Sequence, residues 1–146
     1  MYEEFINNMY QVFSKAEKPE KSEITPHRCT ECDKIRDELF SHNKEDIEDN
    51  LIDYHGDALP LLSPKALKYF IPRYIEYGLL HQKSNAFEST LYHLAPEKID
   101  DYWTARFNIF LKAEKEILIQ YLLLRRDCED SEFDEPYIER GLKFWV

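Results

Sequence analysis

Glycine is scarce in this chain, which has only three glycines among its 146 residues. Proteins built from many hairpins and bulges use glycine at the turns that need unusual backbone angles. The shortage therefore argues against an all-β fold and favours helices. Apolar residues still make up 43% of the chain and aromatic residues 14%, which is enough to build the core of one ordinary domain.

The chain also lacks a run of basic residues. It carries 29 acids against 19 lysines and arginines, for a net charge of −10, and Arg125 and Arg126 are its one adjacent basic pair. Nucleic acids and anionic membranes bind proteins through clustered lysine and arginine, so we expect neither as a partner. A partner protein with a basic surface is the natural complement of this charge.

The sequence predicts neither a secretory leader nor a membrane-spanning stretch. The first residues, Met1-Tyr2-Glu3-Glu4, are acidic where a leader is positive, and the longest apolar stretch, 117–124, contains Gln120. Three cysteines are an odd number, which argues against a disulfide framework. We therefore expect a cytoplasmic protein with reduced thiols.

Apolar residues recur at every third or fourth position, which is typical of amphipathic helices. The pattern predicts an all-α protein that forms a single compact multi-helix domain over residues 1–146, with about six helices. Residues 98–110 are aromatic and do not fit one pattern. Seven segments, some of them short, are candidates for these helices: residues 2–16, 26–41, part of 44–57, 64–80, 85–94, 112–126 and the end of the chain from about 136.

Local signals set the expected helix ends. Thr25-Pro26 and Ser63-Pro64 each combine a capping residue with a proline in the first turn, so both predict a helix start. Pro72 removes one backbone hydrogen bond inside the second of these helices and predicts a kink or break. Residues 127–135 contain six acids and no base, which predicts a solvated, mobile acidic loop.

The strongest pattern for chemistry is His27-Arg28-Cys29-Thr30-Glu31-Cys32. Cysteines three positions apart share one helix face, so both thiolates can reach one zinc ion, and imidazole is a second common zinc ligand. On a regular helix His27 points elsewhere, so it joins the cysteines only if the first turn is irregular. A fourth ligand has to come from a distant position such as His55, Cys128 or His42. The resulting hypothesis is a zinc site of His27, Cys29, Cys32 and His55.

Other interpretations of the same cysteines stay open. Cys29 and Cys32 continue an apolar stripe with Ile35 and Leu39, so the thiols could simply pack in the core. A Cys-x-x-Cys pair at a helix start can also exchange disulfides, although the thioredoxin arrangement needs a strand before the motif and a charged linker precedes it here. A cysteine nucleophile with a histidine base is a third alternative, and nothing in the sequence places a histidine beside Cys29.

Two motifs resemble a known family. His27-Arg28-Cys29-x-Glu31-Cys32 and the later Leu61-Leu62-Ser63-Pro64-x-Ala66-x-x-Tyr69-x-x-Pro72 are similar to an uncharacterised family of small bacterial cytosolic proteins, a domain of unknown function. The resemblance covers most of the chain and includes Phe107-x-x-Phe110-Leu111 and Trp145. It implies a bacterial source, a mainly helical fold and a break near residues 108–111 before the last long helix. It implies no known activity.

For function, the acidic composition favours a protein-interaction module of immunity or accessory type, which neutralises a basic toxin or enzyme. One alternative is a zinc-binding protein that uses Cys29 and Cys32 with His27 or His55. Another is a small enzyme whose site has no recognisable motif. The balance favours a protein that is not an enzyme, and the patterns leave the partner and the oligomeric state open.

Overall fold

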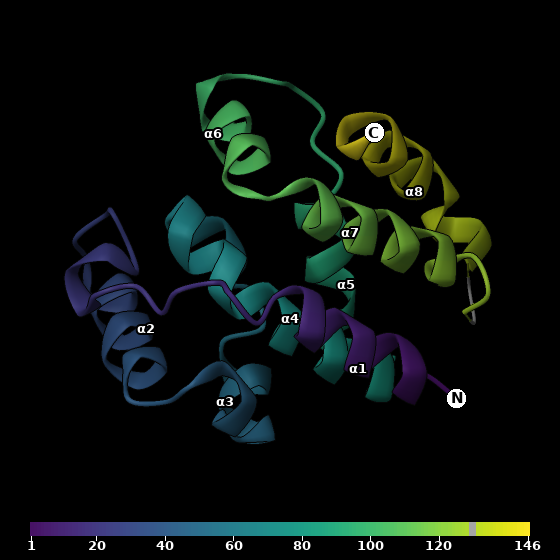
Figure 1. Cartoon of the computed structure of the whole chain (residues 1–146). Coiled ribbons are helices and arrows are strands. Elements are labelled where there is room, and N and C mark those ends of the chain that lie inside the picture. Colours follow the sequence, from purple (N-terminus) through teal and green to yellow (C-terminus); the bar gives the residue numbers. More distant parts are fainter. Residues whose placement is uncertain (129–130) are drawn as a thin grey trace. The chain divides into compact units, whose positions relative to one another are not determined.

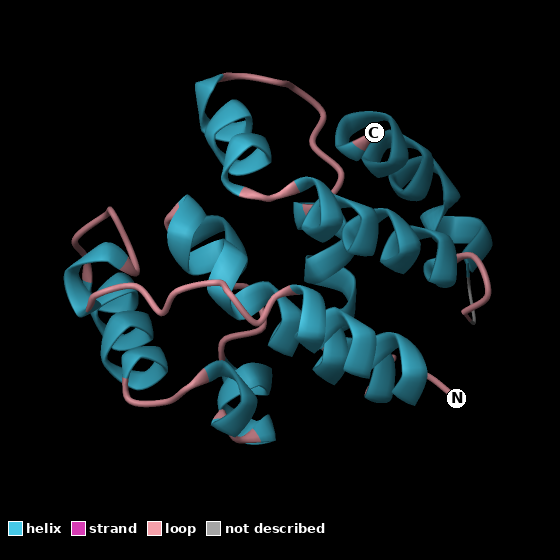
Figure 2. Cartoon of the chain, viewed as in Figure 1, coloured by secondary structure: helices cyan, strands magenta, loops and turns pink. Residues whose placement is uncertain are grey.

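The computed structural model describes residues 1–128 and 131–146, and every regular element in these ranges is helical (Figures 1 and 2). The all-α prediction is confirmed. The described ranges hold eight α-helices rather than about six, together with three short 3₁₀ helices. In chain order these are α1 Glu3–Val12, η1 Lys21–Glu23, α2 Thr30–Phe40, η2 Lys44–Asp46, α3 Asp49–Tyr54, η3 Leu59–Leu61, α4 Pro64–Leu80, α5 Asn85–His93, α6 Asp101–Ile109, α7 Lys112–Arg125 and α8 Ser131–Trp145.

The chain divides into two compact units, residues 1–90 and 91–146. Helices α1 to α4 belong to the first unit and α6 to α8 to the second, while α5 spans the boundary. The prediction of a single domain over residues 1–146 stays a prediction. Within the described residues, no helix combines the length and the apolar character needed to cross a membrane.

Helix α4 is the central element of the first unit, because α1, α3 and η2 all contact it. Its start is the predicted one: the Ser63 hydroxyl accepts a hydrogen bond from the Ala66 amide at 3.1 Å, and Pro64 occupies the first turn. The helix then runs through Pro72, so the predicted break is absent, while the alternative of a kink stays a prediction. An internal proline costs about 3 kcal/mol, and burial of neighbours such as Phe70 and Tyr74 offsets that cost at about 1.5–3 kcal/mol for a large side chain.

Helices α7 and α8 pack along one another in the second unit. Gly141 permits the close approach, because a β-carbon at this position would lie 2.9 Å from both Leu122 Cδ1 and the Leu94 carbonyl oxygen. The segment left ambiguous by the sequence contains α6, whose first turn is capped by the Asp100 carboxylate at 3.1 Å from the Trp103 amide. As the family resemblance implies, the chain leaves helical geometry at residues 110–111 before α7 begins.

The acidic loop predicted over residues 127–135 is wrong for its second half, because residues 131–135 already form the beginning of α8. Residues 129–130 of the same prediction lie outside the described part of the chain. Ion pairs with the end of α7 explain the early helix start: Asp134 lies 3.0 Å from Arg125 and Glu135 lies 2.6 Å from Arg126. Acids in a first helical turn also complement the helix dipole.

Candidate metal centre

Residues 24–29 form the segment that leads into α2, and two contacts fix its path within the first unit. Ile24 is fully buried, and its carbonyl oxygen accepts a hydrogen bond from the Ser63 amide at 2.8 Å. The buried Thr25 hydroxyl accepts a hydrogen bond from Arg36 Nη1 at 2.8 Å. These contacts attach the segment to the start of α4 and to α2 itself.

The predicted helix start at Thr25-Pro26 is wrong, because α2 begins at Thr30. The Thr25 hydroxyl accepts a hydrogen bond from Arg36 instead, and no helix begins beside it. Cys29 is the N-cap instead: its backbone is extended at φ −157° and ψ 171°, and its Sγ accepts a hydrogen bond from the Cys32 amide at 3.3 Å. Residues 24–29 are not helical, so the irregular turn that His27 needs in order to reach the cysteines is present.

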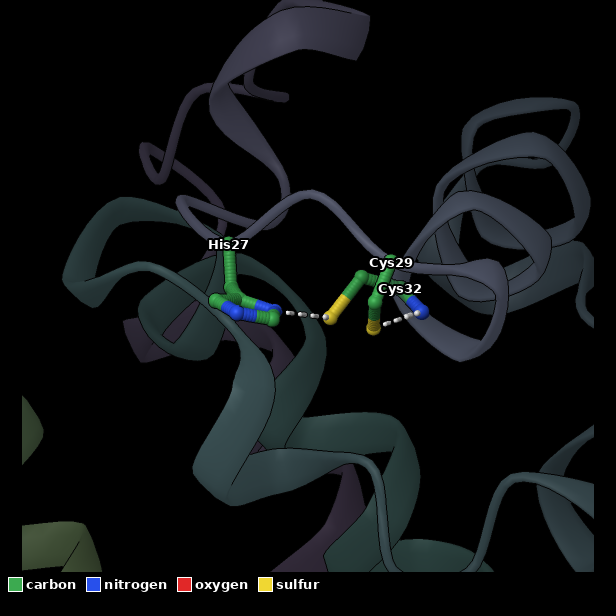
Figure 3. A group of neighbouring side chains, drawn as sticks. All are labelled: His27, Cys29 and Cys32. Carbon is green, nitrogen blue, oxygen red and sulfur yellow. Dashed lines mark hydrogen bonds between the residues drawn. The ribbon is translucent and has the colours of Figure 1, made fainter.

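The side chains of His27, Cys29 and Cys32 meet at this point. Their ligand atoms all lie within 4.8 Å of one another, and His27 Nδ1 is 3.8 Å from Cys32 Sγ. Figure 3 shows the imidazole approaching from the loop while the two sulfurs project from the start of α2. Two thiolates held about 2.3 Å from a tetrahedral zinc ion lie about 3.8 Å apart, so small side-chain rotations bring these atoms to bonding positions.

The two thiols differ in exposure and in proton affinity. Cys29 is half-buried, and the hydrogen bond from the Cys32 amide holds the pKa of its thiol below the ordinary value, with further hydrogen bonds from the Cys32 and His27 side chains acting the same way. Cys32 is fully buried, and burial raises the pKa of its thiol to about 11. One sulfur is therefore disposed to be a thiolate, while the other keeps its proton until a cation displaces it.

His55 does not join this cluster. Its Nε2 lies 2.6 Å from a carboxylate oxygen of Glu38, and the imidazole is buried. The other two candidates for a fourth ligand also have partners of their own. His42 Nδ1 lies 3.0 Å from the Glu38 carbonyl oxygen, and the Cys128 thiol donates to the Leu124 carbonyl oxygen at 3.5 Å. Within the described residues the cluster thus has three members rather than the predicted four.

The core-packing interpretation holds for one thiol alone. Cys32 continues the buried stripe of Ile35 and Leu39, all of them at most 1% exposed. Cys29 lies outside that stripe because it precedes the first helical turn and remains partly accessible. Core packing therefore explains the position of Cys32, whereas the capping hydrogen bond explains the position of Cys29.

A cavity of about 520 Å³ lies between the start of α2 and the end of α3, and none of the three cluster residues is among those that line it. No pattern in the sequence indicates it, because its walls come from segments that only the tertiary structure brings together. Its rim carries a pair that the sequence did not suggest: Lys34 Nζ donates to the Tyr54 hydroxyl at 2.6 Å and lies 4.5 Å from the centre of that ring. The lining residues are Thr30, Glu31, Lys34, Ile35, Tyr54, His55, Asp57 and Ala58.

Fold and site together define an all-α protein with a cluster of two thiols and one imidazole that could hold a metal ion. Comparisons of the chain with protein families, with curated proteins and with solved structures gave no match. The resemblance to a bacterial family, drawn from the motifs around Cys29 and Ser63, stays a prediction.

Proposed function

We propose that this protein binds zinc through His27, Cys29 and Cys32. The observation that carries the proposal is the convergence of three ligand atoms within 4.8 Å of one another. Thiolate and imidazole are the ligands that zinc prefers in proteins, and softer thiolate ligands disfavour magnesium and calcium. The approach of His27 from a separate, anchored loop supports the proposal further, since a packed thiol pair needs no such neighbour.

The number of protein ligands supports an exchangeable zinc ion rather than a structural zinc ion with four protein ligands. Structural zinc sites have four protein ligands, whereas three ligands leave one tetrahedral position for water or for a group on another molecule. His27 is exposed and Cys29 half-buried, so an ion held here lies near the protein surface. Binding would link the 24–28 loop to α2 and stabilise the first unit, by about 2.7 kcal/mol when free zinc is a hundredfold above the Kd.

Zinc titration of the reduced full-length protein against a chromogenic chelator tests this proposal. We expect one ion per chain, and the cobalt-substituted protein should show thiolate-to-metal charge-transfer absorption. The double substitution Cys29→Ser with Cys32→Ser should abolish binding. His27→Asn should weaken it by more than about 10-fold, because it removes one of three ligands and loss of an outer-shell supporting group alone costs about 10- to 100-fold.

Two matched controls make the titration specific to the cluster. Cys128→Ser removes the third thiol of the chain, and His55→Gln removes the imidazole that pairs with Glu38. Both variants should bind zinc as the unaltered protein does. Undiminished binding by the double cysteine variant, or a loss of binding in Cys128→Ser, would contradict the proposal.

The interaction-module hypothesis stays a prediction beside this one. It draws support from the segment around α3, where a group of acidic side chains is exposed in the first unit: Glu45, Asp46, Glu48, Asp49, Asp53 and Asp57. A basic partner surface would complement this group.

A further inference from the structure

We propose that Cys29 and Cys32 also act as a dithiol that exchanges with small disulfides, with Cys29 as the attacking sulfur and Cys32 as the resolving one. This activity goes beyond zinc binding and does not depend on it, because we expect it of the metal-free protein. The class of substrate is a low-molecular-weight disulfide such as oxidised glutathione.

Exposure assigns the two roles. Cys29 is the accessible member of the pair, so a small disulfide in solvent can reach it. Cys32 is fully buried behind it, so a substrate cannot reach Cys32 first. Exchange at a dithiol needs one accessible sulfur and a second sulfur that attacks from within the protein, and the pair meets both conditions.

The backbone at Cys29 allows the disulfide to close. Side chains three positions apart on a regular helix have β-carbons about 5–6 Å apart, whereas a disulfide needs about 3.5–4.5 Å. Cys29 lies outside the helix with an extended backbone, and its Sγ already points back to the first turn, 3.3 Å from the Cys32 amide. Bond formation therefore requires rotation of the Cys29 side chain and loss of one capping hydrogen bond, while α2 stays wound.

The exchange balances in two steps. The Cys29 thiolate attacks one sulfur of the small disulfide, whose S–S bond breaks, and one half leaves as a thiolate that takes up a proton. The Cys32 thiol then gives up its proton and its sulfur attacks Cys29 Sγ, which releases the second half as a thiol. The small disulfide gains two electrons and two protons, and the cysteine pair becomes an intramolecular disulfide.

One consequence rests on the proposed zinc site. A sulfur in a disulfide is no longer a thiolate ligand, so oxidation of the pair would release a bound ion and reduction would restore the site. The oxidised protein should therefore bind zinc far more weakly than the same sample after reduction.

Reaction of the reduced, metal-free, full-length protein with oxidised glutathione tests the exchange, with alkylation of free thiols and intact-mass analysis as the readout. The unaltered protein should lose two hydrogens without a lasting adduct. Cys32→Ser should accumulate one glutathione on Cys29, because nothing resolves the mixed disulfide. Cys29→Ser should react at least about tenfold more slowly, because the remaining thiol of the pair is buried.

Cys29→Ser is a well-matched variant, since serine is itself a favoured N-cap and keeps the start of α2 intact. Circular dichroism should confirm that each variant keeps its helix content, and Cys128→Ser should react as the unaltered protein does. Exchange by Cys29→Ser at the unaltered rate, an unresolved adduct on the unaltered protein, or an adduct mapped to Cys128 would overturn the inference. Zinc binding without exchange would contradict this inference alone, and exchange without zinc binding would contradict the proposed function alone.

Discussion

Two helix ends in this protein carry a cysteine, and the sulfur has the opposite role at each. At the start of α2, Cys29 Sγ accepts a hydrogen bond from a backbone amide. Beyond the end of α7, Cys128 Sγ donates one to the Leu124 carbonyl oxygen. The first turn of a helix presents N–H groups that lack helical partners and the last turn presents carbonyls, so the helix end decides whether a sulfur accepts or donates. At Cys29 the amide hydrogen bond lowers the pKa of the thiol and so favours the thiolate.

The two ends also differ in what holds them. The loop before α2 is fixed by neutral contacts and one buried arginine, Arg36, which donates to Thr25. The end of α7 is held by ion pairs from Arg125 and Arg126 to the first residues of α8. Cys29 at the start of α2 is partly accessible, whereas Cys128 beyond the end of α7 is buried.

Removal of the buried ion pair at the end of α7 should have the largest effect. The Arg125 side chain is 1% exposed and lies 3.0 Å from Asp134. Asp134→Asn should lower the free energy of unfolding by about 3 kcal/mol, the low end for a broken buried pair, because a buried guanidinium loses its charged partner and asparagine keeps an acceptor. Urea unfolding followed by tryptophan fluorescence measures this in the second unit, since Trp103 and Trp145 are the two tryptophans of the chain.

The neighbouring pair supplies the control for this prediction. Arg126 and Glu135 are paired at 2.6 Å with side chains 40% and 39% exposed. Glu135→Gln should therefore cost less than about 1 kcal/mol, as exposed ion pairs do. Equal losses for the two substitutions would show that the end of α7 is not held by its buried pair.

Acid should weaken the second unit through His93, whose side chain is buried. Burial lowers the pKa of His93 from 6.5 to about 3, with Arg106 adding charge repulsion. Between these values the unfolded chain binds a proton at this imidazole and the folded unit does not, so stability falls as the pH falls. The loss is about 1.4 kcal/mol per pH unit, or about 2 kcal/mol near pH 5.

The substitution His93→Gln isolates that contribution. Glutamine keeps an acceptor for Arg106 Nε, which donates to the imidazole at 3.2 Å, and it does not titrate. As the pH drops from 7 toward 5, the unfolding free energy of the unaltered protein should fall relative to that of the variant. A difference that stays constant over this range would refute the assignment.

The smallest effect concerns the cap of α2. Cys29→Ala should destabilise the first unit by about 1 kcal/mol, because the Cys32 amide loses its acceptor, whereas Cys29→Ser should stay within a few tenths of the unaltered protein. Hydrogen exchange of the amides in the first turn of α2 measures both. If alanine protects these amides as well as serine does, the sulfur contributes nothing as a cap and the contrast with Cys128 weakens.

The sequence by itself predicted the features that depend on near neighbours. The apolar periodicity of residues 2–16 and 112–126 gave α1 and α7 within a few residues, and Ser63-Pro64 gave the start of α4. The Cys-x-x-Cys spacing predicted that both thiolates could bind one metal ion. These features follow from side chains within one or two helical turns, which the local pattern records.

Partners from elsewhere in the chain decided the rest. Arg36 donates a hydrogen bond to Thr25, and α2 begins at Thr30 with Cys29 as its N-cap, while Arg125 and Arg126 form ion pairs with acidic residues of the first turns of α8. The anchored loop brought His27 to the two thiols, and Glu38 kept His55 away from them. A short pattern cannot record such pairings, because the strength of a buried hydrogen bond or ion pair depends on groups that only the folded chain brings together.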